Sequence, residues 1–321
     1  MFRAVIIFVR ESTAAKVLLV LAGVSVVALF AGFSRSESPI LAVNLNQAQT
    51  EEILGPSAEK AESFLRSTDL SKIDPPAVAA AAVLTQELGA PTALFERQPD
   101  IRWPIASITK LMTAVIALEQ FSPSLVVNFS PTAVGTDGAS GAFKVGEQFS
   151  VWDMVVAMLT VSSNDSAVAL AEAFPSAQHT PVADFLDVMQ RKAGELGMTQ
   201  TTFADPTGLS FLNQSTPRDL EKLAEYIADK HGEIFVATRQ KSATILELTS
   251  RKTRQLANIN SFAGTEGFLG GKTGFIDVSN GNLLSIFSVR GREIFVLVFG
   301  TQDRFLETEK VYAWLKEAIH D

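Results

Sequence analysis

The chain has 321 residues, of which 47% are hydrophobic, and it carries a formal net charge of −8 and no cysteine. This length and composition suffice for one large globular domain or two. The negative charge argues against a nucleic-acid-binding surface, and the lack of cysteine excludes disulfides, thiol catalysis and a cysteine-based zinc site. The three histidines, His179, His231 and His320, are too scattered to suggest a metal site or the base of a catalytic triad.

An apolar run from Val17 to Phe33 follows the cations Arg3, Arg10 and Lys16. At a rise of about 1.5 Å per residue, a helix of this length nearly crosses a hydrocarbon core of about 30 Å. The preceding cations favour a cytoplasmic N-terminus, so the rest of the chain is expected on the extracytoplasmic side. Residues 1–35 therefore read as a signal anchor or a cleaved signal peptide, and the lack of a clear small-x-small cleavage pattern favours a single-pass anchor in the cell membrane.

Residues 36–75 are polar, which predicts a spacer before a folded domain over residues 76–321. From 77 to 97, two apolar runs on either side of Gly89 predict a strand hairpin. Helical spacing dominates residues 107–230, notably in Pro181–Leu196 and in Thr216–Lys230. Strands return at 243–248, 283–289 and 293–299, and a closing helix is expected over 304–319.

Strands at both ends of a domain with helices between them predict an α+β fold. We expect an antiparallel sheet of terminal strands, flanked by helices and carrying an all-helical insert lobe. The segment that begins at Ser107 then lies between the sheet and the insert.

Three short polar motifs stand out against this pattern. Ser107-Ile-Thr-Lys110 opens an apolar helix, Ser162-Ser163-Asn164 falls between two apolar helices, and Lys272-Thr273-Gly274 follows a glycine-rich segment. Since Ser107 and Lys110 are three residues apart on a helix, their side chains share one face and can meet. The set supplies a nucleophile, a base, a second hydroxyl, an amide and a second cation, which is the equipment for acyl transfer through a serine ester.

Each motif also has a purely structural explanation. Ser107 alone is explained as a helix cap, Ser162 and Asn164 as caps of a connection, and Lys272 as a lysine at an exposed strand edge. The first pattern also arises by chance, because Ser57-Ala-Glu-Lys60 has the same spacing in a polar stretch. Three such coincidences in one order are improbable, so acyl transfer is the favoured interpretation.

The motifs and their surroundings resemble the serine D-alanyl-D-alanine carboxypeptidases, low-molecular-mass penicillin-binding proteins that share a fold with the serine β-lactamases. The resemblance covers roughly residues 76–321 and includes five further segments: Pro104–Ala114, Ser163–Ala167, Ala193–Met198, Phe203–Leu209 and Ser215–Leu220. It implies a membrane-anchored hydrolase that trims the terminal D-alanine from peptidoglycan stem pentapeptides. It also implies that β-lactams inhibit the enzyme covalently and that no cofactor or metal is needed.

The same resemblance implies the catalytic roles. Ser107 is the expected nucleophile, Lys110 its base, and Ser162 the relay of a proton toward the departing amine. Lys110 can act only when it is neutral, so burial and the neighbouring cation Lys272 must lower its pKa. The backbone N–H groups of Ser107 and Phe275 are the expected oxyanion hole.

The substrate-binding roles follow in the same way. Asn164 is expected to hold the amide of the substrate. Lys272, Thr273 and Gly274 are expected at its terminal carboxylate. Two positions depart from the pattern, since Ile276 stands where many relatives have a hydroxyl and Ile259 where some have a basic residue; both changes bear on substrate detail more than on reaction class.

Other activities remain open beside carboxypeptidase. A peptidoglycan D,D-endopeptidase would use the same residues, whereas a catalytically lapsed penicillin-binding protein would not need the motifs to be intact. A class A β-lactamase is disfavoured because its Glu-x-x-Leu-Asn element is missing, Leu209 standing where the glutamate would precede Leu212-Asn213.

Overall fold

The computed structural model describes residues 9–11, 14–21, 24–28, 74–138, 140–175 and 180–319. The chain divides into two compact units, Met1–Lys60 and Ala61–Asp321. The predicted domain over residues 76–321 lies within the second unit. Most of the predicted spacer, residues 36–73, lies outside the described residues, as does the chance motif Ser57-Ala-Glu-Lys60.

In the first unit, three strands form a small antiparallel sheet: β1 (Val9–Glu11), β2 (Ala14–Leu21) and β3 (Val24–Ala28). Part of the run Val17–Phe33, expected as a helix, is therefore described as strand, in keeping with its many β-branched valines. Residues 29–33 lie outside the described residues. No helix within the described ranges is both long enough and apolar enough to cross a bilayer.

The second unit is built on a five-stranded antiparallel sheet of order β12-β13-β14-β4-β5. Its strands are β4 (Ala82–Glu87), β5 (Ala93–Arg97), β12 (Phe268–Ile276), β13 (Asn280–Val289) and β14 (Arg292–Thr301). The two ends of the unit join where β14 pairs with β4, with Val296 opposite Thr85. This confirms the predicted sheet of terminal strands and leaves β12 at one edge.

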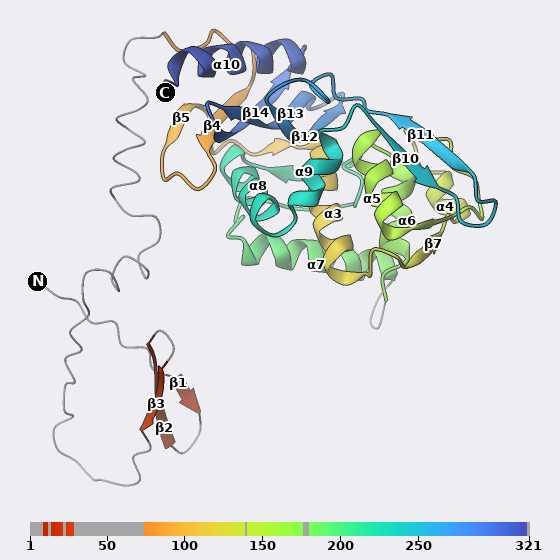
Figure 1. Cartoon of the computed structure of the whole chain (residues 1–321), viewed down its shortest axis with the longest axis horizontal. Coiled ribbons are helices and arrows are strands. Elements are labelled where there is room, and N and C mark those ends of the chain that lie inside the picture. Colours follow the sequence, from red (N-terminus) through yellow and green to blue (C-terminus); the bar gives the residue numbers. More distant parts are fainter. Residues whose placement is uncertain are drawn as a thin grey trace, which may run out of the picture. The chain divides into compact units, whose positions relative to one another are not determined.

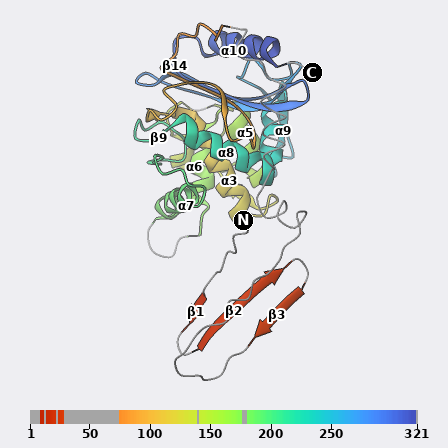
Figure 2. The same cartoon turned by 90° about the vertical axis from the view of Figure 1, so that its left-hand side faces the viewer.

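Helices cover both faces of this sheet, as Figures 1 and 2 show. One face carries α10 (Arg304–Ala318), whose Val311 and Leu315 pack in one cluster with Phe287 and Val296 of the sheet. The helices of the other layer are the 3₁₀ turn η2 (Ala106–Ile108), α3 (Thr109–Gln120), α4 (Pro131–Val134), α5 (Val151–Thr160), α6 (Asn164–Glu172), α7 (Pro181–Glu195), α8 (Pro217–Lys230) and α9 (Gly232–Thr238). Because both faces are covered, the central strands are almost continuously apolar.

Helix α3 is the centre of the helical layer. Every residue from Thr109 to Ala117 is buried, and α5, α6 and α7 all pack against the helix. A helix that is buried all round is anchored from every side. Ser107 and Lys110, at the start of this helix, are thus held in place by the surrounding helices.

Short antiparallel pairs complete the unit: β6 (Trp103–Pro104) with β9 (Gln214–Ser215), β7 (Val126–Asn128) with β8 (Gln148–Ser150), and β10 (Ser242–Leu246) with β11 (Thr253–Ala257). The predicted strand at 243–248 exists, but it pairs with β11 in a separate ribbon and does not join the main sheet. Within β10 only Ile245 is buried, since one face of the ribbon packs on α5 and the other is exposed.

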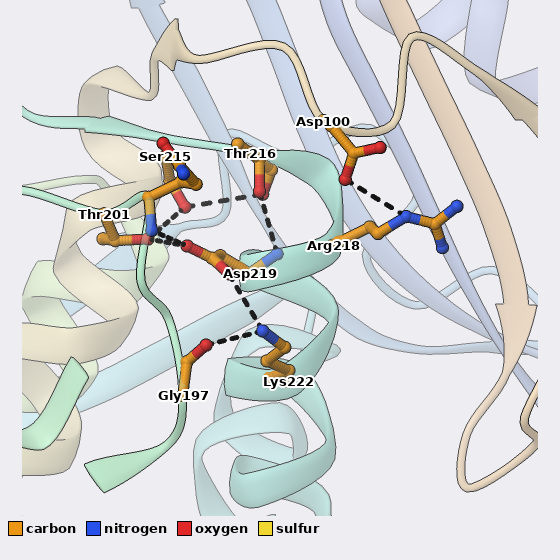
Figure 3. A network of polar contacts seen from close by, with 9 residues as sticks. Asp100, Gly197, Thr201, Ser215, Thr216, Arg218, Asp219 and Lys222 are labelled. Carbon is orange, nitrogen blue, oxygen red and sulfur yellow. Dashed lines mark hydrogen bonds and ion pairs between the residues drawn. The ribbon is translucent and has the colours of Figure 1, made fainter. Parts of the chain in front are cut away.

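A polar network holds the start of α8, as Figure 3 shows. The Thr216 side chain caps the helix by accepting from the backbone N–H of Asp219 at 3.1 Å. The buried Asp219 carboxylate accepts from Thr201 Oγ1 at 2.9 Å and pairs with Lys222 at 3.1 Å. Thr201 in turn shares a 2.7 Å hydrogen bond with Ser215 of β9. Since β9 pairs with β6, the network supports the strand that leads into η2.

Candidate active site

Ser107 is the middle residue of η2, directly before α3. The preceding residue, Ala106, is buried and has a φ of 50°, in the left-handed region that non-glycine residues rarely adopt. The cap positions of η2 and α3 are occupied by Ile105 and Ile108, so helix capping does not explain Ser107. Strained backbone of this kind is characteristic of functional sites.

Lys110 lies one helical turn after Ser107 and is fully buried. Its Nζ is 2.9 Å from Ser107 Oγ, 2.6 Å from Asn164 Oδ1 and 2.6 Å from the carbonyl oxygen of Thr207. Burial lowers the pKa of Lys110 from 10.5 to about 7, while the negative charge of Asp205 acts in the opposite direction. The amine is therefore close to the balance point between its charged and neutral forms near neutral pH.

The three partners of Lys110 differ in what they can do. The oxygens of Asn164 and Thr207 only accept hydrogen bonds, whereas the Ser107 hydroxyl can also donate. A neutral amine has two N–H groups and one lone pair. When the two N–H groups serve the two accepting oxygens, the lone pair is left facing the Ser107 hydroxyl, which is the orientation that a general base requires.

The connection between α5 and α6 supplies the second motif. Ser163 is the residue that caps α6, since its Oγ accepts from the Ser166 N–H at 3.1 Å. Asn164 is buried, and besides its bond to Lys110 its Nδ2 donates to the carbonyl of Asp137 at 2.7 Å. Much of the hydrogen-bonding capacity of the Asn164 amide is thus used within the protein.

Ser162 and Lys272 bring the second and third motifs together. Lys272 Nζ donates to Ser162 Oγ at 2.9 Å and to the carbonyl of Thr273 at 2.9 Å, with Thr273 Oγ1 3.4 Å away. Lys272 and Thr273 are almost fully buried on the edge strand β12. Ser162 has a φ of 58°, a second left-handed residue at the site. Burial, and then the charges of Lys110 and Arg304, hold the pKa of Lys272 well below its ordinary value.

Two glycines from separate segments lie against the backbone around Ser107. A Cβ at Gly208 would lie 2.0 Å from the carbonyl oxygen of Ala106, and one at Gly274 would lie 2.7 Å from that of Ile105. Both glycines therefore lie against the backbone that carries the Ser107 N–H. Phe275 follows Gly274 directly, so the two backbone positions predicted as the oxyanion hole belong to segments in contact.

Hydrogen bonds thus connect the predicted residues in two sets, Ser107–Lys110–Asn164 and Ser162–Lys272–Thr273, and Gly274 lies against the nucleophile turn. Sequence reasoning assigned no chemistry to the loop Asp205–Ser210, which contacts both Lys110 and η2. The signal was present in the segment Phe203–Leu209, but only as part of the resemblance.

Arg304 is a second residue that sequence reasoning missed. It opens α10, is half-buried, and its charge lowers the pKa of Lys272. Its Nε is buried and has no hydrogen-bond partner among the described residues. A buried donor without a partner is costly unless a ligand or water satisfies it. Arg304 is therefore a further cationic group whose charge reaches Lys272.

No group of three or more histidine, aspartate or glutamate side chains in the described part of the chain is arranged to hold a metal ion. His179 and His320 lie outside that part. His231 contacts Glu119 and Glu233, each at 3.3 Å.

Comparison with known proteins places the chain in a family. The family model for D-alanyl-D-alanine carboxypeptidases, peptidase family S11, matches residues 70–303. The chain is 29% identical over 250 residues to a D-alanyl-D-alanine endopeptidase of Escherichia coli, covering 75% of this chain and 78% of that protein. It is 27% identical over 231 residues to a D-alanyl-D-alanine carboxypeptidase of Streptomyces sp. strain K15, covering 69% and 78% respectively.

The fold agrees with this assignment. The crystal structure of the Streptomyces K15 DD-transpeptidase superimposes with a TM-score of 0.69 at 24% identity, covering 76% of this chain and 99% of that chain. With the motifs assembled as described and the family model matching most of the second unit, the chain belongs to the D-alanyl-D-alanine carboxypeptidase family of serine peptidases, whose members carry both carboxypeptidase and endopeptidase names.

Proposed function

We propose that the chain is a serine D,D-carboxypeptidase that removes the terminal D-alanine from peptidoglycan stem pentapeptides through an acyl-enzyme on Ser107. One observation carries the proposal: the fully buried Lys110 lies 2.9 Å from Ser107 Oγ and has its pKa lowered to about 7. Lysines are almost never fully buried unless they are paired, and no carboxylate of the described residues pairs with Lys110. A buried amine held against a serine hydroxyl activates a nucleophile.

In the first step, Ser107 Oγ attacks the carbonyl carbon between the two D-alanines while its proton passes to Lys110 Nζ. The backbone N–H groups of Ser107 and Phe275 stabilise the developing oxyanion, each contributing about 3 kcal/mol. The C–N bond then breaks as the leaving nitrogen takes up a proton, and D-alanine departs. Water later hydrolyses the Ser107 ester and regenerates the hydroxyl.

Ser162 relays the proton to the leaving nitrogen. Its Oγ accepts a hydrogen bond from Lys272 Nζ at 2.9 Å, which leaves the hydroxyl hydrogen of Ser162 free to donate. As that hydrogen passes to the substrate, Ser162 Oγ takes a proton from Lys272 Nζ, and the proton that Lys110 took from Ser107 balances this loss across the two lysines. A hydroxyl poised in this way supports departure of an amine, which is a poor leaving group until it is protonated.

The terminal carboxylate of the substrate is held by Lys272, Thr273 and Arg304. The charge of Arg304 lowers the pKa of Lys272, and a positive potential from both side chains suits an anionic group at this end of the site. Asn164 orients Lys110 and contacts the substrate amide with its remaining capacity. Gly274 allows the substrate backbone to approach the edge strand β12.

A second candidate is D,D-endopeptidase cleavage of peptide cross-links by the same residues. It is favoured by the relative from Escherichia coli, which is named an endopeptidase and aligns over most of both chains. Mass spectrometry after incubation with a disaccharide pentapeptide and with a cross-linked muropeptide dimer separates the two activities. Loss of one alanine from the pentapeptide supports carboxypeptidase, cleavage of the dimer supports endopeptidase, and neither product contradicts both.

Covalent labelling by a fluorescent penicillin tests the acyl-enzyme. The full-length chain in detergent is expected to be labelled, and Ser107→Ala is expected to abolish the label. Ser124→Ala, which changes an exposed serine, serves as the matched control and retains the label. Since the chain lacks the Glu-x-x-Leu-Asn element, the penicilloyl ester is expected to persist, and rapid turnover of penicillin contradicts this.

We further propose that residues 1–35 anchor the enzyme in the cell membrane with residues 76–321 outside the cytoplasm. The length of the apolar run Val17–Phe33 and the cations before it support this arrangement. In cell fractionation, the full-length chain is expected in the membrane, and extracellular protease is expected to reach the enzyme in spheroplasts. A processed N-terminus after residue 30, read by mass spectrometry, would instead identify a cleaved signal peptide.

A further inference from the structure

The loop Asp205–Ser210 is held together by one carboxylate. Asp205 Oδ1 accepts from the Thr207 N–H at 2.7 Å, from Thr207 Oγ1 at 2.6 Å and from the Gly208 N–H at 2.7 Å. Asp205 Oδ2 accepts from the Ser210 N–H at 2.7 Å and from Asn213 Nδ2 at 2.7 Å. Burial alone would raise the pKa of Asp205. The hydrogen bonds to its carboxylate outweigh this effect and hold the pKa below its ordinary value, so the ionised form is favoured.

Two of the residues that Asp205 binds, Thr207 and Gly208, contact the active site. The carbonyl of Thr207 accepts from Lys110 Nζ at 2.6 Å and is one of the two oxygens that orient the amine. Gly208, with a φ of +86°, lies so close to the Ala106–Ser107 peptide bond that a Cβ there would be 2.9 Å from the Ser107 nitrogen. The base and the nucleophile turn are thus reached from one carboxylate through consecutive residues.

We propose that Asp205 is a positioning residue for acyl transfer: its carboxylate shapes the loop so that the Thr207 carbonyl turns the Lys110 lone pair toward Ser107 and Gly208 supports the backbone of the nucleophile turn. This inference rests on the proposed function of Ser107 and Lys110. It assigns to the loop a role in orienting the base, beyond the chemistry of the three motifs.

The same carboxylate acts on Lys110 through its charge. The elements that pack against α3 and η2 carry Lys272 on β12 and Asp165 on α6, besides Asp205 on the loop. Asp205 is the carboxylate whose charge raises the pKa of Lys110 and so partly offsets the effect of burial. A neutral residue at 205 removes this offset and allows Lys110 to lose its proton at lower pH.

The chain offers a control that loosens the loop without changing its charge. Thr113, one turn beyond Lys110 on α3, donates from Oγ1 to the carbonyl of Pro206 at 2.7 Å. Thr113→Val removes this tether with little change of shape and leaves Asp205 intact. If the loop has a purely structural role, this variant and the neutral variants of Asp205 should affect the pH dependence of acylation alike. If Asp205 has a positioning role, only its neutral variants should shift it.

The experiment is the rate of penicillin acylation against pH, measured on the full-length chain and on Asp205→Asn, Asp205→Ser, Asp205→Glu and Thr113→Val. In the Asn and Ser variants, the midpoint of the acid limb is expected to fall by about one pH unit, and the plateau rate by about tenfold. Asp205→Glu keeps the charge and is expected to keep the midpoint. Thr113→Val is expected to lower the melting temperature without moving the midpoint.

Asparagine places its NH2 group against N–H donors that Asp205 accepts from, which disturbs the loop. Serine is included because its hydroxyl can still accept a hydrogen bond that caps the turn. The proposal is overturned if the midpoints of both neutral variants coincide with that of the wild type, or if Thr113→Val shifts the midpoint as they do. Failure of both neutral variants to fold also contradicts the proposal, because the Asp205 carboxylate would then be needed for the stability of the fold and not for positioning Lys110. Failure of the wild type to be labelled at Ser107 contradicts the proposed function itself, so the two failures are distinct.

Discussion

Lys110 Nζ lies 2.6 Å from Asn164 Oδ1, although the two residues are 54 positions apart along the chain. The contact joins the N-terminus of α3 to the N-terminus of α6, and the Asn164 amide is held in turn by the carbonyl of Asp137. Asn164 therefore orients the amine of Lys110, the residue proposed as the base. The predicted role of Asn164 in binding the substrate amide stays a prediction.

The buried position of Lys110 predicts the pH dependence of acylation. Its pKa of about 7 means that the neutral, reactive form predominates above that pH and declines below it. The acylation rate is therefore expected to rise with pH through about 7, falling about tenfold per unit below. Lys110→Arg, which keeps the charge permanently, is expected to lose at least about a hundredfold in rate. Stopped-flow acylation measures both, and a flat profile or an active Arg variant contradicts the assignment.

Arg304 is expected to act in binding and little in the chemical step. Arg304→Gln removes a cation beside Lys272 and is expected to raise KM for a pentapeptide by about tenfold with a small change in kcat. Steady-state release of D-alanine provides the measurement. Arg218→Gln, which removes an exposed arginine paired with Glu96, is the control and should leave KM unchanged. Equal effects of the two variants would exclude a role for Arg304 at the substrate carboxylate.

Close packing at Gly208 can be separated from backbone strain. Gly208 and Gly146 have φ values of +86° and +84°, but a Cβ added at Gly208 would meet a backbone oxygen at 2.0 Å, whereas one added at Gly146 would have no neighbour within 4 Å. Gly146→Ala is expected to cost about 1 kcal/mol of stability through strain alone. Gly208→Ala is expected to cost about 2 kcal/mol more and to slow acylation at least tenfold, since the Ala106–Ser107 peptide must shift. Urea unfolding and penicillin labelling test this, and equal losses in the two variants would contradict it.

Glu221 predicts how stability changes at alkaline pH. Burial, followed by the hydrogen bond and charge of Glu225, raises the pKa of Glu221 from 4.5 to about 8. Between these values the folded state binds a proton that the unfolded state has released, so this group makes the fold less stable as pH rises toward 8. Glutamine is neutral throughout and can still accept the hydrogen bond that Gln86 donates at 3.2 Å.

Glu221→Gln is therefore expected to raise the melting temperature relative to the wild type at about pH 8.5 and to lose this advantage at about pH 5. Thermal unfolding across this range provides the measurement. Glu309→Gln, at an exposed position of α10, is the control and should follow the wild type. An advantage that does not vary with pH would show that the Glu221 carboxyl is not the titrating group.

Helices and strands were predicted where apolar periodicity is strong. The helix α8 follows the capping residue Thr216, as its cap signature predicts, and β13 and β14 are long apolar runs. Periodicity reports only which face of an element is buried, so it could not show that the strand at 243–248 pairs outside the main sheet. The part of the run Val17–Phe33 that is described as strand shows the same limit, because the length of an apolar run predicts a membrane helix whereas its β-branched residues favour strands.

The sequence by itself determined which chemical groups the protein carries and in what order, and serine, lysine and glycine in three spaced motifs favour acyl transfer. Only the tertiary structure decided what surrounds Lys110: full burial, the carbonyl of Thr207 and the charge of Asp205. A pKa depends on solvation and on charges within a few ångströms in space, and residues nearly a hundred positions apart create that environment. The protonation state of Lys110 is thus a property of the folded chain.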